Sequence, residues 1–305
     1  MPNVQPLRLK TIAEFHQFRG LPKPAHPLIS VINVETLNNK PGEEFALIKD
    51  FYSIGLKRNI NYKVKYGQQS VDFDEGMMFF MSPGQLLQLE FEKDSVVNQT
   101  GWMLLIHPDF LWNTPLAKKI KQYEFFNYAV HEALFVSEKE DAMVSSIMLH
   151  MEKEYLANLD AFTQDIIIMQ LELIFTYAER FYHRQFLSRK KTSHAVLDRM
   201  EDVLSRYFKG DRIATRGVPT VSYVADELNI SANYLGSMLK VLTGQNAQQH
   251  IHNKLIELAK EKLSGTELSV SEIAFGLGFE HSQSFSKLFK TKTNLSPIKF
   301  RETFN

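Results

Sequence analysis

The first third of the chain alternates between short apolar runs and turn signals. Runs of apolar, aromatic or β-branched residues occupy positions 28–34, 50–55, 77–81 and 102–106. Turn signals such as Pro41-Gly42 and Ser82-Pro83-Gly84 separate them. Short strands with this punctuation are typical of a β-barrel or a β-sandwich. The pattern therefore predicts a β-rich region that extends to about residue 112.

The pattern changes to helical spacing after Pro115. No glycine or proline occurs between Leu116 and Lys209. Apolar residues recur at steps of three and four over 142–159 and 161–187, which predicts two long amphipathic helices. Their apolar faces must be covered, either by the β-rich region or by a second copy of the chain in a homodimer. The sequence leaves these two alternatives open.

A polar and basic segment, 188–194, follows these helices and is predicted to be a linker. A chain of 305 residues is long enough for two domains of ordinary size. We therefore expect one domain over 1–187, β-rich first and helical afterwards, and a second, helical domain over 195–305.

The helical C-terminal part contains an internal repeat. Residues 221–230 and 270–279 share Val, Ser, Ala and Leu at four equivalent positions. In both copies apolar residues fall at i, i+3, i+4 and i+7, which predicts a short amphipathic helix. Asn229 and Gly278 are equivalent, and both residue types tolerate the left-handed conformation that ends a helix. In the second copy, Ser269 and Glu272 form a capping-box pattern.

A second helix is repeated after each of these turns. Leu235 and Leu239 in the first copy correspond to Phe285 and Phe289 in the second. Helix, tight turn and helix is the arrangement of a helix-turn-helix DNA-binding motif. The apolar periodicity of residues 246–263 predicts a connecting helix of about 27 Å. Two motifs held in this way can enter major-groove segments about 34 Å apart on one side of a duplex.

The second copy and the residues after it carry a specific motif. Its parts are Ile273-Ala274, Gly278-Phe279, the stretch 285–290 (FSKLFK), Leu295-Ser296-Pro297 and Phe300-Arg301. From about residue 195 to 305, the chain resembles the DNA-binding domain of the AraC/XylS family of bacterial transcription regulators. It departs from the family pattern at Lys254, Ser284 and Asn294, where the family usually has arginine, an aromatic residue and glycine.

The resemblance implies an α+β chain. An N-terminal cupin-like β-barrel with trailing amphipathic helices is expected to precede an all-α C-terminal domain, in which a linker helix joins two helix-turn-helix motifs. The implied function is that of a sequence-specific transcription regulator. It would bind double-stranded DNA, interact with RNA polymerase, form a homodimer and respond to a small-molecule effector through its N-terminal domain.

The recognition helices supply the candidate DNA contacts. Candidate base-reading residues are Asn233, Gly236, Ser237 and Lys240 in the first motif, and Gln283, Ser284 and Lys287 in the second. Asparagine and glutamine can form two hydrogen bonds with adenine, and lysine can donate to guanine. Candidate phosphate contacts are Lys290, Lys292, Lys299 and Arg301. The alternative for each of these residues is that it is an ordinary solvated surface residue with no role in DNA binding.

The first recognition helix is poor in long cationic side chains. Gly236 and Ser237 offer little reach toward bases. Either sequence reading depends mainly on the second motif, or the first motif reads DNA through shape and backbone contacts.

Aromatic and cationic residues of the β-rich region are candidates for an effector pocket. They are Tyr52, Arg58, Tyr62, Tyr66, Phe79 and Phe91, with Lys57 as a second source of charge. The alternative is that the aromatic residues form a core and the cations are solvated. Leu87 occupies the position at which many cupin-like barrels carry a metal-binding histidine. His250 and His252 lie in the connecting helix, where i and i+2 do not face each other. We therefore expect no metal, no cofactor and no cupin catalysis.

Composition narrows the classes of function. The chain has no cysteine, which excludes disulfides, thiolate catalysis and zinc–thiolate sites. From Ala195 onward, 14 Lys and Arg against 12 Asp and Glu give a balance of +2, which permits DNA binding without arguing for it. No apolar stretch approaches the ~20 residues of a membrane span. The start of the chain has no signal-peptide core, so we expect a cytoplasmic protein with no membrane partner.

Two other functions remain as alternatives. A barrel enzyme fused to a DNA-binding module would need a convergent His/Glu cluster or a nucleophile, and the sequence shows neither. A helical protein-interaction scaffold would not bind DNA. Salt dependence distinguishes it from a regulator, because phosphate contacts make DNA affinity fall steeply with salt.

Overall fold

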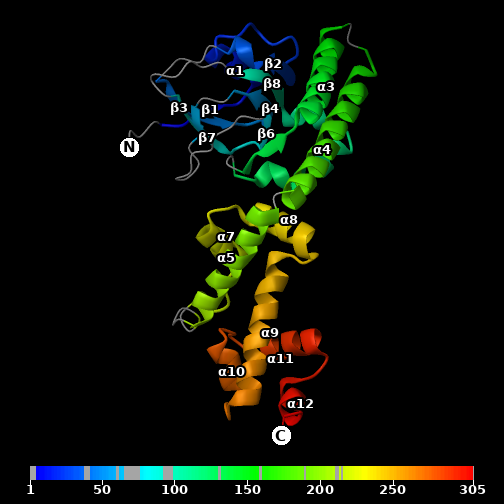
Figure 1. The fold of residues 1–305 in the computed structure, drawn as a ribbon. Helices are drawn as coiled ribbons and strands as arrows, with labels where there is room; N and C mark the ends of the chain where they lie inside the picture. The colour runs from blue at the N-terminus through cyan, green and yellow to red at the C-terminus, as the bar shows by residue number, and fades with distance from the viewer. Residues whose placement is uncertain are drawn as a thin grey trace. The chain divides into compact units, whose positions relative to one another are not determined.

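The computed structural model of the chain describes residues 5–37, 42–59, 62–64, 76–91, 99–129, 132–157, 160–188, 190–209, 213 and 216–304. The chain divides into two compact units, Met1–Gln185 and Phe186–Asn305 (Figure 1). The expected domain limits at 187 and 195 stay predictions.

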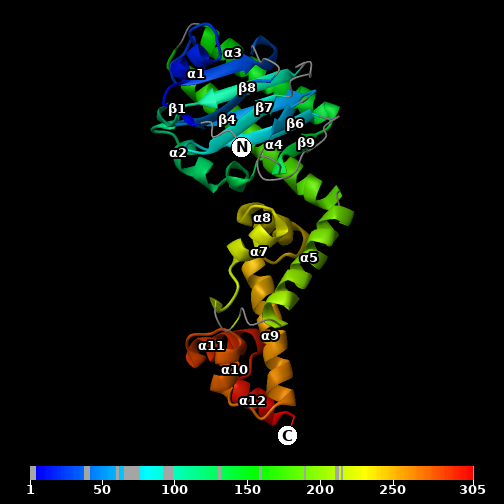
Figure 2. The same ribbon diagram turned by 90° about the vertical axis from the view of Figure 1, so that its left-hand side faces the viewer.

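The N-terminal unit is built on two β-sheets (Figures 1 and 2). The four-stranded sheet has the order β1 (Leu7–Leu9), β3 (Glu44–Lys49), β7 (Leu86–Phe91) and β5 (Tyr62–Val64). The five-stranded sheet has the order β2 (Ile29–Asn33), β8 (Thr100–Ile106), β4 (Tyr52–Arg58), β6 (Gly76–Met81) and β9 (Leu134–Val136). Strands β1 and β3 pair in parallel, and the other neighbouring strands pair antiparallel.

The predicted α+β class is confirmed, and the four predicted apolar runs lie in β2, β4, β6 and β8. The cupin-like barrel is not confirmed. In the described part of the chain the strands form two separate sheets, and no closed barrel is found.

Helices cover the sheets and connect the strands. The α-helices of this unit are α1 (Ile12–Phe18), α2 (Leu116–Lys119), α3 (Glu138–Leu156) and α4 (Thr163–Ser188). The 3₁₀ helices are η1 (Val34–Thr36), η2 (Pro108–Leu111), η3 (Ile120–Gln122) and η4 (Glu124–Asn127). The two long helices predicted from the apolar periodicity are α3 and α4.

Helix α3 packs on the five-stranded sheet. It begins with a capping box, in which Ser137 and Glu140 satisfy each other's backbone N–H groups. Near its end, the Tyr155 hydroxyl accepts the Val31 backbone N–H at 2.9 Å and donates to the Val31 carbonyl at 3.3 Å. These bonds attach the helix to strand β2.

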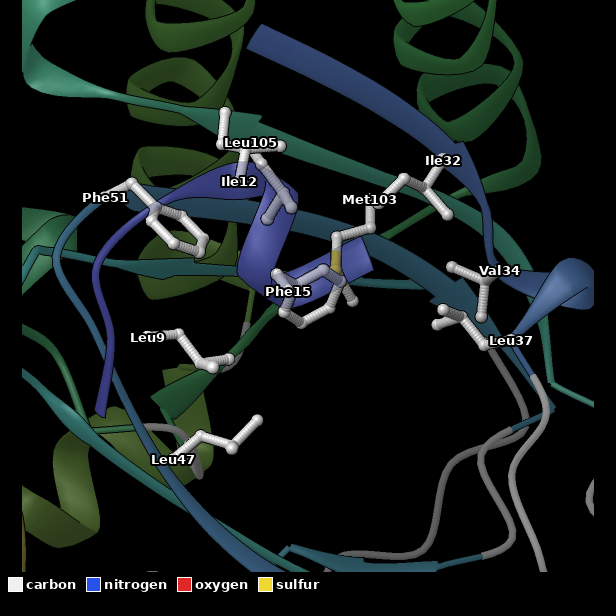
Figure 3. Packing of buried hydrophobic residues seen from close by; sticks show 10 residues of the cluster. All are labelled: Leu9, Ile12, Phe15, Ile32, Val34, Leu37, Leu47, Phe51, Met103 and Leu105. Atoms are coloured by element: carbon white, nitrogen blue, oxygen red, sulfur yellow. The ribbon is translucent and has the colours of Figure 1, made fainter. Parts of the chain in front are cut away.

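A hydrophobic core lies between α1 and the two sheets (Figure 3). Figure 3 shows ten of its residues, from α1, both sheets and the segments that follow them: Leu9, Ile12, Phe15, Ile32, Val34, Leu37, Leu47, Phe51, Met103 and Leu105. The rings of Phe15 and Phe51 meet edge to face, with centroids 6.4 Å apart. Burial of each such side chain contributes about 1.5–3 kcal/mol, which holds α1 against the sheets.

The C-terminal unit is helical. Its helices are α5 (Lys190–Lys209), α7 (Val221–Leu228), α8 (Ala232–Thr243), α9 (Ala247–Gly265), α10 (Val270–Gly276), α11 (Ser282–Thr293) and α12 (Pro297–Glu302). Helix α5 begins at Lys190, so most of the predicted linker segment, 188–194, is helical. Among the described residues of either unit, no helix is long and apolar enough to cross a membrane.

Candidate nucleic-acid interface and interior cavity

The first helix-turn-helix motif consists of α7 and α8. The side chain of Thr220 caps the start of α7. The helix ends at Asn229, which adopts the left-handed conformation with φ 56°. The N–H of Ile230 then donates to the Ala225 carbonyl at 3.1 Å, and Ser231 caps α8. This is the hydrogen-bond pattern of a Schellman turn.

The second motif, α10 and α11, repeats this geometry. Ser269 and Glu272 form the predicted capping box. Gly278 has φ 82°, and the N–H of Phe279 donates to the Ala274 carbonyl at 3.0 Å. The left-handed residue and the bond that closes the turn occupy equivalent positions in the two copies. The turn predicted at Asn229 and Gly278 is therefore confirmed in both.

Gly278 has a second reason to be glycine. A Cβ at this position would lie 2.7 Å from the carbonyl carbon of Gly217 and 2.9 Å from the nitrogen of Val218. The Tyr207 hydroxyl of α5 donates to the Gly217 carbonyl at 3.0 Å. The loop before the first motif is thus held between α5 and the turn of the second motif.

Helix α9 connects the two motifs. A capping box of Asn246 and Gln249 begins it, and Ile251, Leu255 and Ala259 lie on its buried side. Figures 1 and 2 show α7 and α8 at one end of α9, and α10, α11 and α12 at the other. Its 19 residues correspond to about 28 Å. The predicted connecting helix is therefore present.

The recognition helices α8 and α11 have the predicted faces. Leu235, Leu239, Phe285 and Phe289 are buried. Of the candidate base-reading residues, Asn233, Lys240, Gln283, Ser284 and Lys287 are exposed, and Gly236 and Ser237 are half-buried. A Cβ at Gly236 would meet no atom within 4 Å, so this position faces open space.

The candidate phosphate contacts differ in their surroundings. Lys290, Lys292 and Lys299 are exposed. The ammonium of Lys292 donates to Asn253 Oδ1 at 3.0 Å, which connects α11 to α9. The guanidinium of Arg301 donates from Nε to the Leu263 carbonyl at 3.2 Å and from a terminal nitrogen to a carbonyl after α9. Arg301 therefore holds α12 to the end of α9, and its contact with phosphate stays a prediction.

The histidine pair of α9 has separate partners. His250 Nε2 lies 2.9 Å from Thr243 Oγ1, and His252 Nε2 lies 2.9 Å from Gln248 Nε2. Burial lowers the pKa of both imidazoles, and the charge of Lys292 lowers that of His252 further. Across the described residues, no group of three or more His, Asp or Glu side chains is placed to hold a metal ion.

An interior cavity lies between the two sheets of the N-terminal unit. The space in it that a water molecule can occupy measures about 40 Å³. Its wall is largely apolar and includes Phe15, Leu37, Leu47 and Met103, which Figure 3 shows in the same interior.

The cavity contains some of the predicted effector residues and not others. Phe79, Phe91 and Lys57 line it. Arg58 instead pairs with Asp141 of α3 on the other face of the sheet, and the hydrogen bond that Arg58 donates to the Asp141 carboxylate raises the pKa of the guanidinium. Tyr52 also faces that side, where the centroid of its ring lies 5.2 Å from that of the Phe126 ring. The Tyr62 side chain and the whole of Tyr66 lie outside the described residues.

The cavity also holds two cations that sequence reasoning missed, Arg19 and Lys49. Arg19, Lys49 and Lys57 are 7%, 3% and 4% exposed. Burial lowers the pKa of Lys49 to about 7. Burial, with the nearby charges of Lys49 and Arg19, lowers the pKa of Lys57 to about 7. The signal for Lys49 was its position in β3, where it shares the inward-facing side with Leu47.

Comparison with known proteins identifies first the type of domain in the C-terminal unit and then the relatives of that domain. Residues 224–303 match the model of a helix-turn-helix domain. A transcription regulator of Pseudoalteromonas carrageenovora, described as an uncharacterized HTH-type regulator in the cgkA 5′ region, is 34% identical over 85 residues. That match covers 28% of this chain and 50% of the relative. The Escherichia coli transcriptional activator RhaS is 35% identical over 79 residues, which cover 26% of this chain and 28% of RhaS.

The C-terminal unit thus carries a helix-turn-helix DNA-binding domain. Its relatives are regulators of the AraC family, which confirms the resemblance seen in the sequence. Among solved structures, the C-terminal domain of AraT, a response regulator from Geobacillus stearothermophilus, is 30% identical to this chain, with a TM-score of 0.31. The aligned region covers 35% of this chain and 84% of the AraT domain. The chain spans at most half the length of the two curated relatives named above.

Proposed function

We propose that the chain is a sequence-specific DNA-binding transcription regulator. The observation that carries the proposal is the pair of helix-turn-helix motifs, with equivalent caps and turns, at the two ends of one helix. The names of the relatives support it, since both are transcription regulators.

In this proposal α8 and α11 enter successive major-groove segments on one side of a duplex. Base reading falls to the exposed side chains of these helices, Asn233, Lys240, Gln283, Ser284 and Lys287, with Gly236 and Ser237 at the closest approach of α8. Lys290, Lys292 and Lys299 contact phosphates, and such contacts make the affinity salt-dependent.

The N-terminal unit is proposed to regulate the DNA-binding unit. It would be a two-sheet relative of the cupin-like domains, without catalysis, and would bind a small-molecule effector in the cavity between its sheets. The exposed apolar side chains of α4, Met169 and Leu173, support a homodimer. RNA polymerase is a further proposed partner, implied by the family resemblance, and a cytoplasmic location is proposed because it is consistent with DNA binding.

Selection from a random duplex library tests the function. The full-length protein is incubated with the library at near-physiological salt, and the retained DNA is sequenced. We expect an enriched motif with two half-sites about one helical turn apart. Affinity for the enriched site should fall steeply as salt is raised.

A charge-matched control variant distinguishes a folding defect from the loss of a DNA contact. Gln283→Ala and Lys287→Ala remove exposed side chains and should weaken binding to the selected site while far-UV circular dichroism stays unchanged. Lys121→Ala, in η3 of the other unit, should bind as the wild type does. Absence of retention at low salt would contradict the proposal and favour the scaffold alternative.

A further inference from the structure

Helix α9 lies between the two helix-turn-helix motifs (Figures 1 and 2). Its rise per residue sets the distance between them. The rotation of one recognition helix relative to the other depends on the contacts that each motif makes with α9 and with the other motif. Two such contacts connect the second motif to the first, one at the turn before α11 and one in the last turn of α11.

The side chain of Asn253, on α9, connects the ends of the two recognition helices. Its Oδ1 accepts a hydrogen bond from the Lys292 ammonium, in the last turn of α11, at 3.0 Å. Its Nδ2 donates to Gln245 Oε1 at 2.8 Å, and Gln245 lies in the turn between α8 and α9. An ammonium can only donate, so the Asn253 oxygen must face Lys292, and the amide nitrogen is left for Gln245.

The surroundings of this amide are suited to hold a fixed geometry. Asn253 and Gln245 are both half-buried, so the bond between them is partly shielded from water. A hydrogen bond in such surroundings is stronger than the same bond in solvent. The backbone N–H of Gln245 also donates to the Thr243 hydroxyl at 3.2 Å, which orients Gln245 in its turn. The first recognition helix is therefore tied to α9 at the residue that faces Asn253.

The backbone of Gly217 and Val218 provides the second contact. These residues precede α7, and the turn of the second motif packs against them so closely that a Cβ at Gly278 would lie 2.7 Å from the Gly217 carbonyl carbon. A Cβ at Gly217 would in turn lie 3.2 Å from the Gly278 carbonyl oxygen. Because α11 is held both at the turn before it and in its last turn, it cannot rotate relative to the first motif without breaking one of these contacts.

We propose that Asn253 is a positioning residue that, through Gln245 and Lys292, fixes α11 relative to α8 and makes the protein selective for one spacing between its two half-sites. As selectivity for DNA spacing, this inference rests on the proposed function; as a restraint on the two motifs, it does not. Insertion of one base pair moves a half-site by about 3.4 Å and rotates it by about 35° around the duplex. A restrained pair of motifs cannot follow this displacement, whereas a pair that turns about α9 can follow part of it.

A distance measurement without DNA tests the restraint. The chain has no cysteine, so Ser222→Cys and Ser271→Cys introduce two unique sites for nitroxide spin labels. These exposed serines occupy equivalent positions in α7 and α10. Double electron–electron resonance on the full-length protein, diluted with unlabelled protein, then gives the distribution of distances between the two motifs. We expect one narrow distribution, and a broader one when Asn253→Leu is added.

Neutral substitutions remove the hydrogen bonds without changing the charge of the DNA-binding surface. Asn253→Leu removes both bonds, and Gln245→Leu removes one of them. Leucine has a higher helix propensity than asparagine, so Asn253→Leu should not lower Tm, and a misfolded variant would be recognised by a lower Tm. Gln248→Leu is the matched control, because the Gln248 amide is exposed on the same helix and its partner, His252, also belongs to α9. It should leave the distance distribution unchanged.

Duplexes with altered spacing test the selectivity. The site enriched by the library selection is lengthened or shortened by one base pair between its half-sites, and Kd is measured by fluorescence anisotropy. For the wild type, we expect this change to weaken Kd about tenfold or more, comparable to the loss of one base-reading contact. The penalty should shrink by about three- to tenfold in Asn253→Leu and Gln245→Leu, and should stay the same in Gln248→Leu.

The remaining DNA-binding properties separate a positioning role from a direct contact. Asn253→Leu changes no base-reading and no charged side chain. Its base preference within each half-site, and the dependence of its affinity on salt, should therefore remain those of the wild type. Lys292 is not substituted in this test, because its charge is also proposed to contact a phosphate.

Three results would overturn the proposal: the wild type gives a broad distance distribution, Asn253→Leu keeps the wild-type distribution and spacing penalty, or Gln248→Leu changes both as much as Asn253→Leu does. Failure of the proposed function gives a different result. A protein whose distribution broadens in Asn253→Leu, but which selects no DNA motif, contradicts the regulator proposal and leaves the restraint standing. A protein that selects two half-sites and binds them equally well at several spacings contradicts the spacing selectivity alone.

Discussion

At the scale of single residues, the turn of each helix-turn-helix motif depends on one left-handed position. The first copy uses Asn229 and the second uses Gly278, with φ 56° and 82°. Asparagine suffices in the first turn because its side chain tolerates this conformation. The second turn also meets the backbone of Gly217, and there only glycine fits.

Exchange of the two residue types should therefore have unequal effects. Gly278→Asn keeps a residue that tolerates positive φ and adds a Cβ against backbone atoms, so we expect a loss of about 1–3 kcal/mol in the free energy of unfolding. Asn229→Gly should change stability by no more than about 1 kcal/mol. Urea unfolding followed by circular dichroism measures both. Equal losses would mean that the contact with Gly217 is unimportant.

Lys287 and Lys292 are exposed on the same helix and are predicted to act differently on DNA. Lys287→Ala should relax preference at particular base pairs, each by about 1–3 kcal/mol. Lys292→Ala should weaken all sequences alike and reduce the salt slope by about 1. A library of single-base variants of the selected site measures both. The assignment of roles fails if the two variants show the same profile.

At the scale of elements, the first recognition helix contains a glycine in its interior that faces open space. A glycine in a helix interior costs about 1 kcal/mol relative to alanine, so Gly236→Ala should stabilise α8 by about that amount. If the backbone of α8 approaches DNA at this point, the added methyl group should also weaken binding at the first half-site. Urea unfolding and titration with the selected site measure the two effects.

Gly265→Ala is the matched control, since a Cβ there also meets open space at the end of α9. It should leave DNA affinity unchanged. If the Gly236→Ala variant binds the first half-site as tightly as the wild type does, Gly236 is not part of the DNA interface.

Strand β4 shows how one element serves two environments. Ser53, Gly55 and Lys57 face the cavity side, whereas Tyr52 and Arg58 face the helices. Successive side chains of a strand point to opposite faces, so neighbours such as Lys57 and Arg58 cannot share one pocket. This alternation explains why the predicted effector residues of β4 separated in the structure.

The buried lysines of β3 and β4 predict a pH dependence of stability. Their pKa values are about 7 in the folded protein, against an ordinary 10.5. Between these values the unfolded chain binds more protons than the folded one, so the free energy of unfolding rises with pH. From pH 7 to 9 the slope should reach up to about 1.4 kcal/mol per pH unit for each lysine. Well below pH 7 the lysines are protonated in both the folded and the unfolded state, and this contribution no longer changes.

Urea unfolding followed by tryptophan fluorescence measures this slope in the N-terminal unit. The free energy of unfolding of the double variant Lys49→Met, Lys57→Met should not change with pH over the same range. At pH 7 the double variant should be more stable than the wild type. Tyr155, whose pKa burial raises, opposes the trend only near and above its ordinary value of 10.0. A wild-type protein with no slope between pH 7 and 9 would contradict the burial of these charges.

At the scale of the whole molecule, the exposed apolar side chains of α4 are the proposed interface of a homodimer. Met169 and Leu173 on α4 are 61% and 43% exposed. Side chains at i and i+4 share one face of a helix, so the two form a continuous apolar strip. Met169→Glu with Leu173→Glu should shift the protein from dimer to monomer in analytical ultracentrifugation. His183→Glu, exposed elsewhere on the same helix, should remain dimeric; a wild-type monomer would contradict the proposed interface.

Much of the architecture was predictable because it depends on local spacing. The strands at 28–34, 50–55, 77–81 and 102–106 were visible as bounded apolar runs. Strands β3 and β7 were not predicted from the sequence, because both carry charged or amide side chains among their apolar ones. The bonds of Arg301 to the carbonyls of Leu263 in α9 and Leu268 after it could not be predicted, because they join residues 38 and 33 positions apart.

The sequence by itself determined the tandem helix-turn-helix domain. Its repeat, caps and left-handed turns are local, since each depends on residues within a few positions of one another. Only the tertiary structure decided which cations of the N-terminal unit share a cavity. Arg19, Lys49 and Lys57 come from three elements, and their common interior exists because two sheets pack face to face. No local pattern specifies that arrangement, because it is set by strand pairing between distant parts of the chain.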